Sequence, residues 1–120
     1  DLQTGAVVDY TRDPGGYNEA EGIFPDGRHT LVESDRHTDK KKAWQIDLYR
    51  LALDGSGRLD RLTHFNDIAE RYHGSNGDVS PDGRYVALQL GIHGFGAGQG
   101  RGVLLIDLQQ WEAATTARPK

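Results

Sequence analysis

The chain has 120 residues, of which 36% are hydrophobic and 27% are charged, and it carries a net charge of −4. This composition fits one ordinary domain and is too rich in Leu, Val, Ile, Tyr and Trp for a disordered chain. The acidic balance disfavours nucleic-acid binding through a basic face, so no nucleic-acid partner is expected, and the run Lys40-Lys41-Lys42 is interpreted as a solvated loop. The absence of cysteine excludes disulfides and Cys-ligated zinc, and no apolar run reaches the length of a membrane span.

Sixteen glycines predict many tight turns and therefore many short strands. In chain order, Asp1-Leu2 and Ala6–Tyr10 are expected to be strands joined at Thr4-Gly5. Gly22–Phe24 is a third short strand, and Pro25-Asp26-Gly27 is a turn, because Pro presets φ, Asp bonds its own backbone and Gly takes positive φ. The next strands are predicted at Arg28–Ser34, Trp44–Leu53 and Arg58–His64, with a turn at Asp54–Gly57.

The same order of elements returns further along the chain. Strands are predicted at Asp78–Ser80, Arg84–Leu90 and Gly102–Leu108, with a second Pro-Asp-Gly turn at 81–83. The apolar residues of Trp44–Leu53 and Gly102–Leu108, including the run Val103–Ile106, are nearly continuous, which favours strands covered on both faces. Gln109–Thr116 is expected to be a helical turn or a fraying end. The glycine-rich stretch Gly94–Gly100 is interpreted as a loop between strands, because a strand and not a helix follows it.

Two motifs recur along the chain. The two Pro-Asp-Gly-Arg turns lie 56 residues apart, and an Asp-Leu pair occurs at Asp1-Leu2, Ile46-Asp47-Leu48 and Ile106-Asp107-Leu108. Four strands in each repeat of this length are typical of a β-propeller blade. A β-sandwich or meander with chance Pro-Asp-Gly turns is the alternative, and the recurrence of both motifs argues against it.

These residues resemble the PD40 repeats of TolB-like β-propellers. The resemblance is carried by Asp47-Leu48-Tyr49, Asp54-Gly55, Arg61-Leu62-Thr63 and Ser80-Pro81-Asp82-Gly83-Arg84, and it extends over nearly the whole chain. It implies an all-β fold of two four-stranded antiparallel blades plus the end of a preceding blade. The expected boundaries are 1–16 for the preceding blade, 17–72 for the first full blade and 73–120 for the last. Phe24 in place of the usual Ser, and the missing fourth strand after Leu108, depart from the pattern.

Two blades cannot close a ring, and open sheet edges invite pairing. We therefore expect the rest of the propeller to come from a longer chain, with other copies of this chain as the alternative. In the blade topology the longest loops share one end of the molecule, and long loops on a rigid scaffold commonly carry function. The candidate ligand-binding residues at this end are Tyr17, Glu19, Glu21, His37, His73, Asn76 and His93.

Within this set, His37 and His93 occupy equivalent positions in the repeat, as do Tyr17 and His73. No cofactor and no catalytic residue is expected. The alternative is a divalent metal ion at the mouth of the central channel, because histidine nitrogens with one or two carboxylates suit such an ion. Asp26 and Asp82 are assigned to turn structure, and His29 to a structural or exposed position.

The resemblance is specific for fold and poor for function, because related propellers serve as scaffolds, peptidase domains and sugar-acid lyases. We expect a non-catalytic module that binds a protein, peptide or glycan through its loop-rich face. The alternatives are a metal-dependent sugar-acid lyase or hydrolase-like enzyme, and the propeller portion of a prolyl-oligopeptidase-type peptidase. The family resemblance alone favours a periplasmic or extracellular location.

Overall fold

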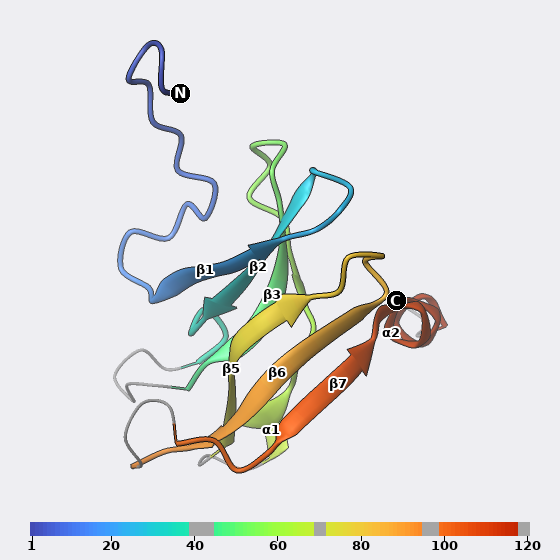
Figure 1. The fold of residues 1–120 in the computed structure, drawn as a ribbon. Helices are drawn as coiled ribbons and strands as arrows, with labels where there is room; N and C mark the ends of the chain where they lie inside the picture. Colours follow the sequence, from blue (N-terminus) through green and yellow to red (C-terminus); the bar gives the residue numbers. More distant parts are fainter. Residues whose placement is uncertain (39–44, 69–71, 95–98, 118–120) are drawn as a thin grey trace.

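The computed structural model describes residues 1–38, 45–68, 72–94 and 99–117, and these residues fold mainly as two antiparallel sheets (Figure 1). The first sheet has the order β1-β2-β3-β4 and the second has the order β5-β6-β7. The strands are β1 Asn18–Ile23, β2 His29–Ser34, β3 Asp47–Ala52, β4 Leu59–Arg61, β5 Tyr72–Val79, β6 Tyr85–Ile92 and β7 Val103–Asp107. Two helices accompany them, α1 Phe65–Ile68 and α2 Leu108–Thr116. The all-β class is confirmed. Lys40–Lys42 and part of the 94–100 loop lie outside the described residues.

The two Pro-Asp-Gly turns have the same local structure, as the sequence predicts. In each turn the glycine has a positive φ, 64° in the first and 71° in the second, and its N–H donates to the carbonyl three residues earlier. The Asp carboxylate accepts a hydrogen bond from the N–H two residues on, at 2.8 and 3.0 Å. These residues are Asp26, Gly27 and Arg28 in the first sheet and Asp82, Gly83 and Arg84 in the second. Each turn joins the first and second strands of its sheet.

The second recurring motif does not occupy equivalent positions in the two sheets. Asp47 opens β3 and pairs with Ser34, whereas Asp107 closes β7 and pairs with Tyr85. Because His29 and Tyr85 follow the equivalent turns, the structural counterpart of Asp107 is Ala52, which pairs with His29. The prediction that Ile46-Asp47-Leu48 and Ile106-Asp107-Leu108 are equivalent is therefore wrong, and the repeat rests on the turns and on strand order.

The N-terminal residues also differ from the prediction. Residues 1–16 contain turns and irregular backbone but no strand, so the strands expected at Asp1-Leu2 and Ala6–Tyr10 are not formed. At the other end, the second sheet has only three strands among the described residues, so the expected four-stranded unit is formed in the first sheet alone, and the missing fourth strand noted after Leu108 is confirmed. The chain instead enters α2 directly after β7, because the Asp107 carboxylate caps the helix by accepting from the N–H groups of Gln109 and Gln110.

The apolar core lies between the two sheets and joins them. Leu31 and Leu48 of the first sheet share one buried cluster with Val86 and Leu88 of the second. Strand β5 contacts β1, β2 and β3, so the inner strand of the second sheet lies against the first sheet. Burial of apolar surface stabilises a protein by about 25 cal/mol per Å². The contact between the sheets is therefore a major source of stability.

Strand β7 is much more exposed than its counterpart β3. The side chains of β3 are almost all buried, with Leu48 and Tyr49 both at 0% exposure. In β7, Val103 is 80% and Leu105 is 65% exposed. The prediction of a strand covered on both faces is confirmed for β3 and is wrong for β7, because no strand or sheet of the described residues lies over β7.

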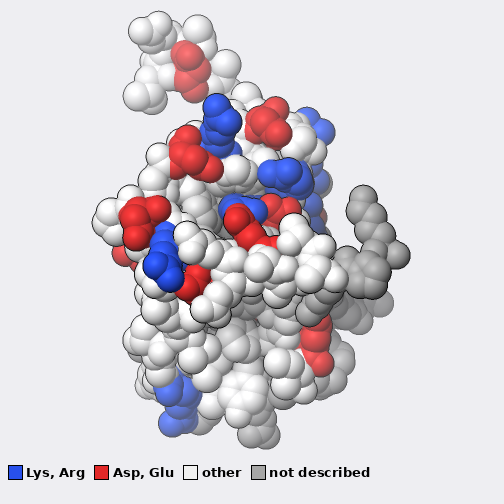
Figure 2. All heavy atoms as spheres, turned by 90° about the vertical axis from the view of Figure 1, so that its right-hand side faces the viewer, with Lys and Arg blue, Asp and Glu red and all other residues white. Residues whose placement is uncertain are grey.

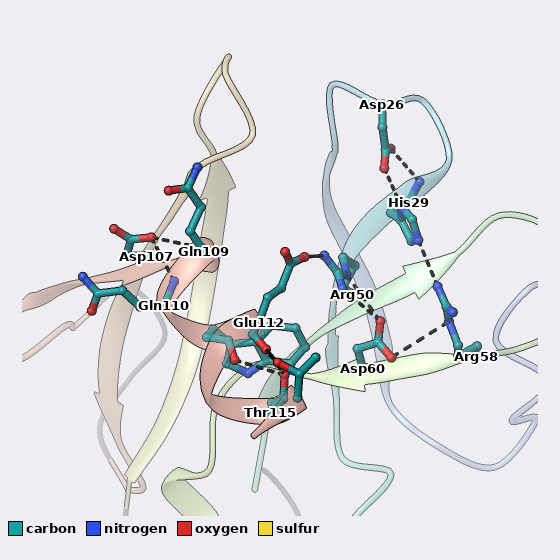
Figure 3. A network of polar contacts seen from close by, with 12 residues as sticks. Asp26, His29, Arg50, Arg58, Asp60, Asp107, Gln109, Gln110, Glu112 and Thr115 are labelled. Atoms are coloured by element: carbon teal, nitrogen blue, oxygen red, sulfur yellow. Dashed lines mark hydrogen bonds and ion pairs between the residues drawn. The ribbon is translucent and has the colours of Figure 1, made fainter. Parts of the chain in front are cut away.

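Helix α2 ties the end of the second sheet to the first. Figure 3 shows Glu112 of α2 directed towards Arg50 of β3, and the two side chains form an ion pair of 2.7 Å. The Arg50 guanidinium also lies 5.3 Å from the centre of the Trp111 ring and 3.3 Å from Asp60 of β4. Leu108 and Trp111 pack on the shared core. Neither helix in the described part of the chain is long and apolar enough to cross a membrane.

Candidate functional site

Glutamate side chains meet where β1 and β2 lie beside β5. Glu19 and Glu21 are two residues apart on β1, and residues at this spacing point to the same side of a strand. Glu33 of β2 pairs directly with Glu19. The register of β1 shifts between Ala20 and Gly22, so a bulge at Glu21 helps to aim this side chain. One carboxylate oxygen from each of the three glutamates lies within 4.8 Å of the other two. We call Glu19, Glu21 and Glu33 the glutamate cluster.

Strand β5 contributes the backbone that holds the buried member of this cluster. Glu33 is only 3% exposed, and its carboxylate accepts a hydrogen bond from the backbone N–H of Asn76. Asn76 has a positive φ of 50°, and the register of β5 shifts between Ser75 and Asp78. The inner strands of both sheets are therefore bulged at a similar place. The bulge in β5 turns an N–H group out of the ladder and towards Glu33.

Burial and mutual repulsion alter the ionisation of these carboxyl groups. Burial, together with the nearby charges of Glu21 and Glu19, raises the pKa of Glu33 to about 7, and the bond from Asn76 opposes this shift. Burial and the charge of Glu19 also raise the pKa of Glu21. The hydroxyl of Tyr17 donates to Glu19, and burial and this bond raise the pKa of Tyr17. The cluster therefore favours either a proton or a positively charged neighbour.

The sequence-predicted residues Tyr17, Glu19, Glu21 and Asn76 are thus brought together. The sequence analysis did not identify two neighbours of these residues, Glu33 and Gln89. The side-chain amide of Asn76 donates to the side-chain oxygen of Gln89 at 2.9 Å. Their signal was present in the sequence, because Glu33 and Gln89 lie 56 residues apart, at the same position in the repeat. Each also follows two apolar residues in its strand, Leu31-Val32 in β2 and Ala87-Leu88 in β6.

The histidines of the predicted set do not join the glutamate cluster. His73 lies over Gly91, its cross-strand partner, so closely that a methyl group at Gly91 would fall 2.1 Å from the imidazole. Burial, and to a lesser degree the charge of His93, lowers the pKa of His73. The Nδ1 atom of His73 is buried without a hydrogen-bond partner among the described residues. His73 is therefore a largely buried side chain of the second sheet, with His93 near enough for its charge to act on it.

His37 lies apart from both groups. Its ring is 5.4 Å from the ring of Tyr49, and burial and the charges of Arg61 and Arg36 lower its pKa. His37 and His93 therefore occupy similar positions, each in the turn that follows the second strand of its sheet, and do not form a shared site. In the part of the chain that the structure describes, the only groups of three or more side chains that could hold a metal ion come from the three glutamates.

The carboxylate of Asp47 belongs to structure and not to a site. Asp47 is 1% exposed, and both of its oxygens accept hydrogen bonds from the end of β4 and from the segment that follows it. The donors are the guanidinium of Arg61 at 2.6 Å, the hydroxyl of Thr63 at 2.6 Å, the amide of Asn66 at 2.8 Å and the N–H of Phe65 at 3.1 Å.

Asp26 is likewise structural, since it holds the turn and pairs with His29 at 2.6 Å.

A scan of protein-family models finds no match to this chain, and no curated protein is significantly similar to it. The arrangement of the site itself must therefore carry any functional conclusion.

Proposed function

We propose that the chain is a non-catalytic binding module built from consecutive blades of a β-propeller. Three features support the architecture: the shared strand order of the two sheets, their equivalent Pro-Asp-Gly turns and the similar bulges in β1 and β5. The contact of β5 with the first sheet also fits neighbouring blades, whose faces pack on one another around an axis.

The ligand of this module is a protein, peptide or glycan that presents a positively charged group. The observation that carries this proposal is the convergence of three carboxylates within 4.8 Å, with Glu33 buried and held by β5. Like charges at this separation repel one another, so a cation placed between them is attracted by all three. Glu19 is exposed and Glu21 is half-buried, which leaves the cluster open on one side.

A divalent cation is the second candidate ligand for the same place. Oxygen atoms alone make up the donor set of the glutamate cluster, and carboxylate oxygens suit Ca²⁺, Mg²⁺ and Mn²⁺. The enzyme alternatives gain less support. The histidines that a lyase or hydrolase site would combine with these carboxylates lie elsewhere among the described residues, and Asp26 and Asp82 are engaged in turns.

Calorimetric titration with two probes tests the proposal. The chain is titrated with a tri-arginine peptide and, separately, with CaCl₂ and MnCl₂, at low salt and at pH 8, where Glu33 is ionised. The double variant Glu19→Gln/Glu21→Gln is expected to weaken binding of the peptide at least about tenfold, because two of three attracting charges are lost. Asp54→Asn, which removes an exposed carboxylate from a turn outside the cluster, is the matched control and should bind as the wild type does.

The outcomes separate the candidates. Binding of the peptide that is lost in the double variant and kept in Asp54→Asn supports the cationic ligand. Binding of the metal ions alone, with the same dependence on the two glutamates, replaces it with the divalent cation. Equal binding to wild type and double variant, or no binding of any probe, rejects the glutamate cluster as a ligand site.

A further inference from the structure

Among the described residues, the outer edge of the second sheet has no neighbouring strand, whereas the same edge of the first sheet is paired. Strand β3 has β4 beside it, but β7 has only β6 among the described residues. Helix α2 does not cover the edge, because its contacts with Arg50 lead it towards the first sheet. Figure 2 shows the molecule from the side of β7 and α2, and much of the described surface there carries no charge. This edge therefore combines unpaired backbone with exposed apolar side chains, which is a template for another strand.

The strand pairing fixes which residues of β7 correspond to those of β3. With the two turns superposed, Leu104, Leu105 and Ile106 stand where the first sheet has Tyr49, Arg50 and Leu51. In the first sheet these three residues pair with β4, through Tyr49↔Arg61, Arg50↔Asp60 and Leu51↔Leu59. A strand that pairs with β7 in the same way would therefore meet Leu104, Leu105 and Ile106.

One segment of this chain has the sequence layout of β4 and forms no strand. Gly5 and Gly57 both have positive φ, 71° and 73°, and a threonine follows each after six residues, at Thr11 and Thr63. Val7, Val8 and Asp9 thus correspond to Leu59, Asp60 and Arg61 of β4. Val7 is 92% and Val8 is 61% exposed. We call residues 6–10 the N-terminal segment.

The start of the chain also repeats the segment that follows β7. Asp1-Leu2-Gln3 matches Asp107-Leu108-Gln109 in sequence. In both places the Asp carboxylate accepts hydrogen bonds from the N–H groups two and three residues on, at 2.9 and 2.7 Å for Asp1. The N-terminal segment therefore follows a stretch with the same sequence and local structure as the stretch that ends β7. It occupies the place in the repeat where a fourth strand would begin.

The side chains that would meet are complementary. In the first sheet Arg50 faces Asp60 across the strands, and the two form an ion pair of 3.3 Å. Leu105 and Val8 occupy the corresponding positions in the second pairing, so an apolar pair replaces the charged pair. The apolar pair Leu51↔Leu59 of the first sheet likewise corresponds to the apolar pair Ile106↔Val7. Arg61, whose guanidinium pairs with Asp47 at the start of β3, is replaced by Asp9, and the β7 counterpart of Asp47 is Gly102, so this ion pair of the first sheet has no counterpart in the pairing.

The N-terminal segment cannot reach the β7 of its own chain. Thr11 and Arg12 are held at the first sheet, because the carbonyl of Thr11 accepts from Arg36 and the guanidinium of Arg12 donates to the carbonyl of Gly55. The few residues before Thr11 span only about 3.5 Å each. Figure 1 shows this segment and β7 on opposite sides of the molecule.

We infer that the N-terminal segment of a second copy of this chain adds to β7 as the fourth strand of its sheet, in the register Val7↔Ile106, Val8↔Leu105 and Asp9↔Leu104. The contact is head-to-tail, since each copy offers a strand at one end and an edge at the other. Main-chain hydrogen bonds supply affinity and the apolar pairs supply register. Neither Glu19 nor Glu21 takes part, so this inference does not depend on the ligand site.

A charge-swap experiment on the whole chain tests the pairing. Sedimentation equilibrium over a range of concentrations is expected to show reversible self-association of the wild type. Val8→Asp and Leu105→Arg, taken singly, should each weaken association at least about tenfold, because each leaves a charge against an apolar partner. An equimolar mixture of the two single variants, and the double variant Val8→Asp/Leu105→Arg, should both regain association, because the introduced charges recreate the pair that Arg50 and Asp60 form.

Both substituted side chains are exposed, so the variants are expected to keep the fold, and circular dichroism checks this. Ile68→Asp, which places the same charge at an exposed apolar residue of α1 that belongs to neither surface, serves as the control and should associate as the wild type does. A wild type that is monomeric at all concentrations overturns the inference and leaves the edge for a strand from another protein or from a longer chain. Association that is unaffected by the single variants, or not restored by mixing them, also overturns it.

Discussion

The buried carboxyl group of Glu33 makes the stability of the fold depend on pH. Its pKa in the folded chain is raised to about 7 from the ordinary value of 4.5, chiefly by burial. A group with a raised pKa binds more protons in the folded state between these two values, so stability falls as the pH rises through this range. We predict that the free energy of unfolding, measured in urea, decreases from pH 4.5 to pH 7 and that Glu33→Gln removes most of this decrease.

The amide of the Glu33→Gln variant keeps an oxygen that can accept from the Asn76 N–H, so the variant isolates the charge from the hydrogen bond. Above pH 7 it should be more stable than the wild type, because no buried carboxylate has to ionise beside Glu19 and Glu21. Asp54→Asn, at an exposed turn, is the control and should leave the pH profile unchanged. An unchanged profile in Glu33→Gln would show that Glu33 is not the group that titrates.

Residue-scale prediction from the sequence succeeded where a role is local and failed where it depends on packing. The roles of Asp26 and Asp82 follow from the turn chemistry of Pro-Asp-Gly, and both aspartates bond the backbone two residues on. Asp47 and Asp107 share a motif, yet one is buried under Arg61 while the other caps a helix. Glu33 was missed because its place beside Glu19 depends on how β1 pairs with β2, and its burial depends on the approach of β5.

At the scale of the elements, the bulged strand β5 packs closely on the first sheet through Gly77. A methyl group added there would lie 2.6 Å from Leu31 and 3.2 Å from Leu48, which are both fully buried. We predict that Gly77→Ala lowers the free energy of unfolding by about 1–3 kcal/mol, because extra volume in a packed core forces its neighbours to move. Chemical denaturation of the two proteins measures the difference.

Gly22 of the paired inner strand β1 provides the matched control for this substitution. A methyl group there would meet its nearest neighbour, Val79, at 3.9 Å, which is an ordinary contact. Gly22→Ala should therefore change stability by less than Gly77→Ala does. Equal losses in the two variants would mean that the cost comes from the backbone of the strands and not from the contact between sheets.

The bounds of the central strands could be predicted because glycine and proline mark the turns, whereas β1 and β5 begin four and six residues before the strands predicted at Gly22–Phe24 and Asp78–Ser80. The central strands β2, β3 and β6 fall within or close to their predicted ranges. Ala6–Tyr10 has strand-like residues but forms no strand, because a strand needs a partner to satisfy its backbone groups. In the same way, the apolar run of β7 predicts a strand covered on both faces, but no described strand of this chain covers it. A local sequence pattern can predict that a strand needs a neighbour, but it cannot identify which segment the neighbour is.

At the scale of the whole molecule, the two sheets are expected to unfold as one unit, because they share a single core. Leu88 of β6 is 2% exposed and lies in one cluster with Leu31 and Leu48 of the first sheet. We predict that Leu88→Ala costs about 2–5 kcal/mol, as a cavity in a core does, and that the loss appears in both sheets. Amide hydrogen exchange measures this loss: protection in β2 and β3 should fall together with protection in β6.

Leu105→Ala, at an exposed position of β7, is the control and should leave the exchange of β2 and β3 unchanged. If Leu88→Ala lowered protection in the second sheet alone, each sheet would be an independent folding unit, and the contact of β5 with the first sheet would contribute little to stability.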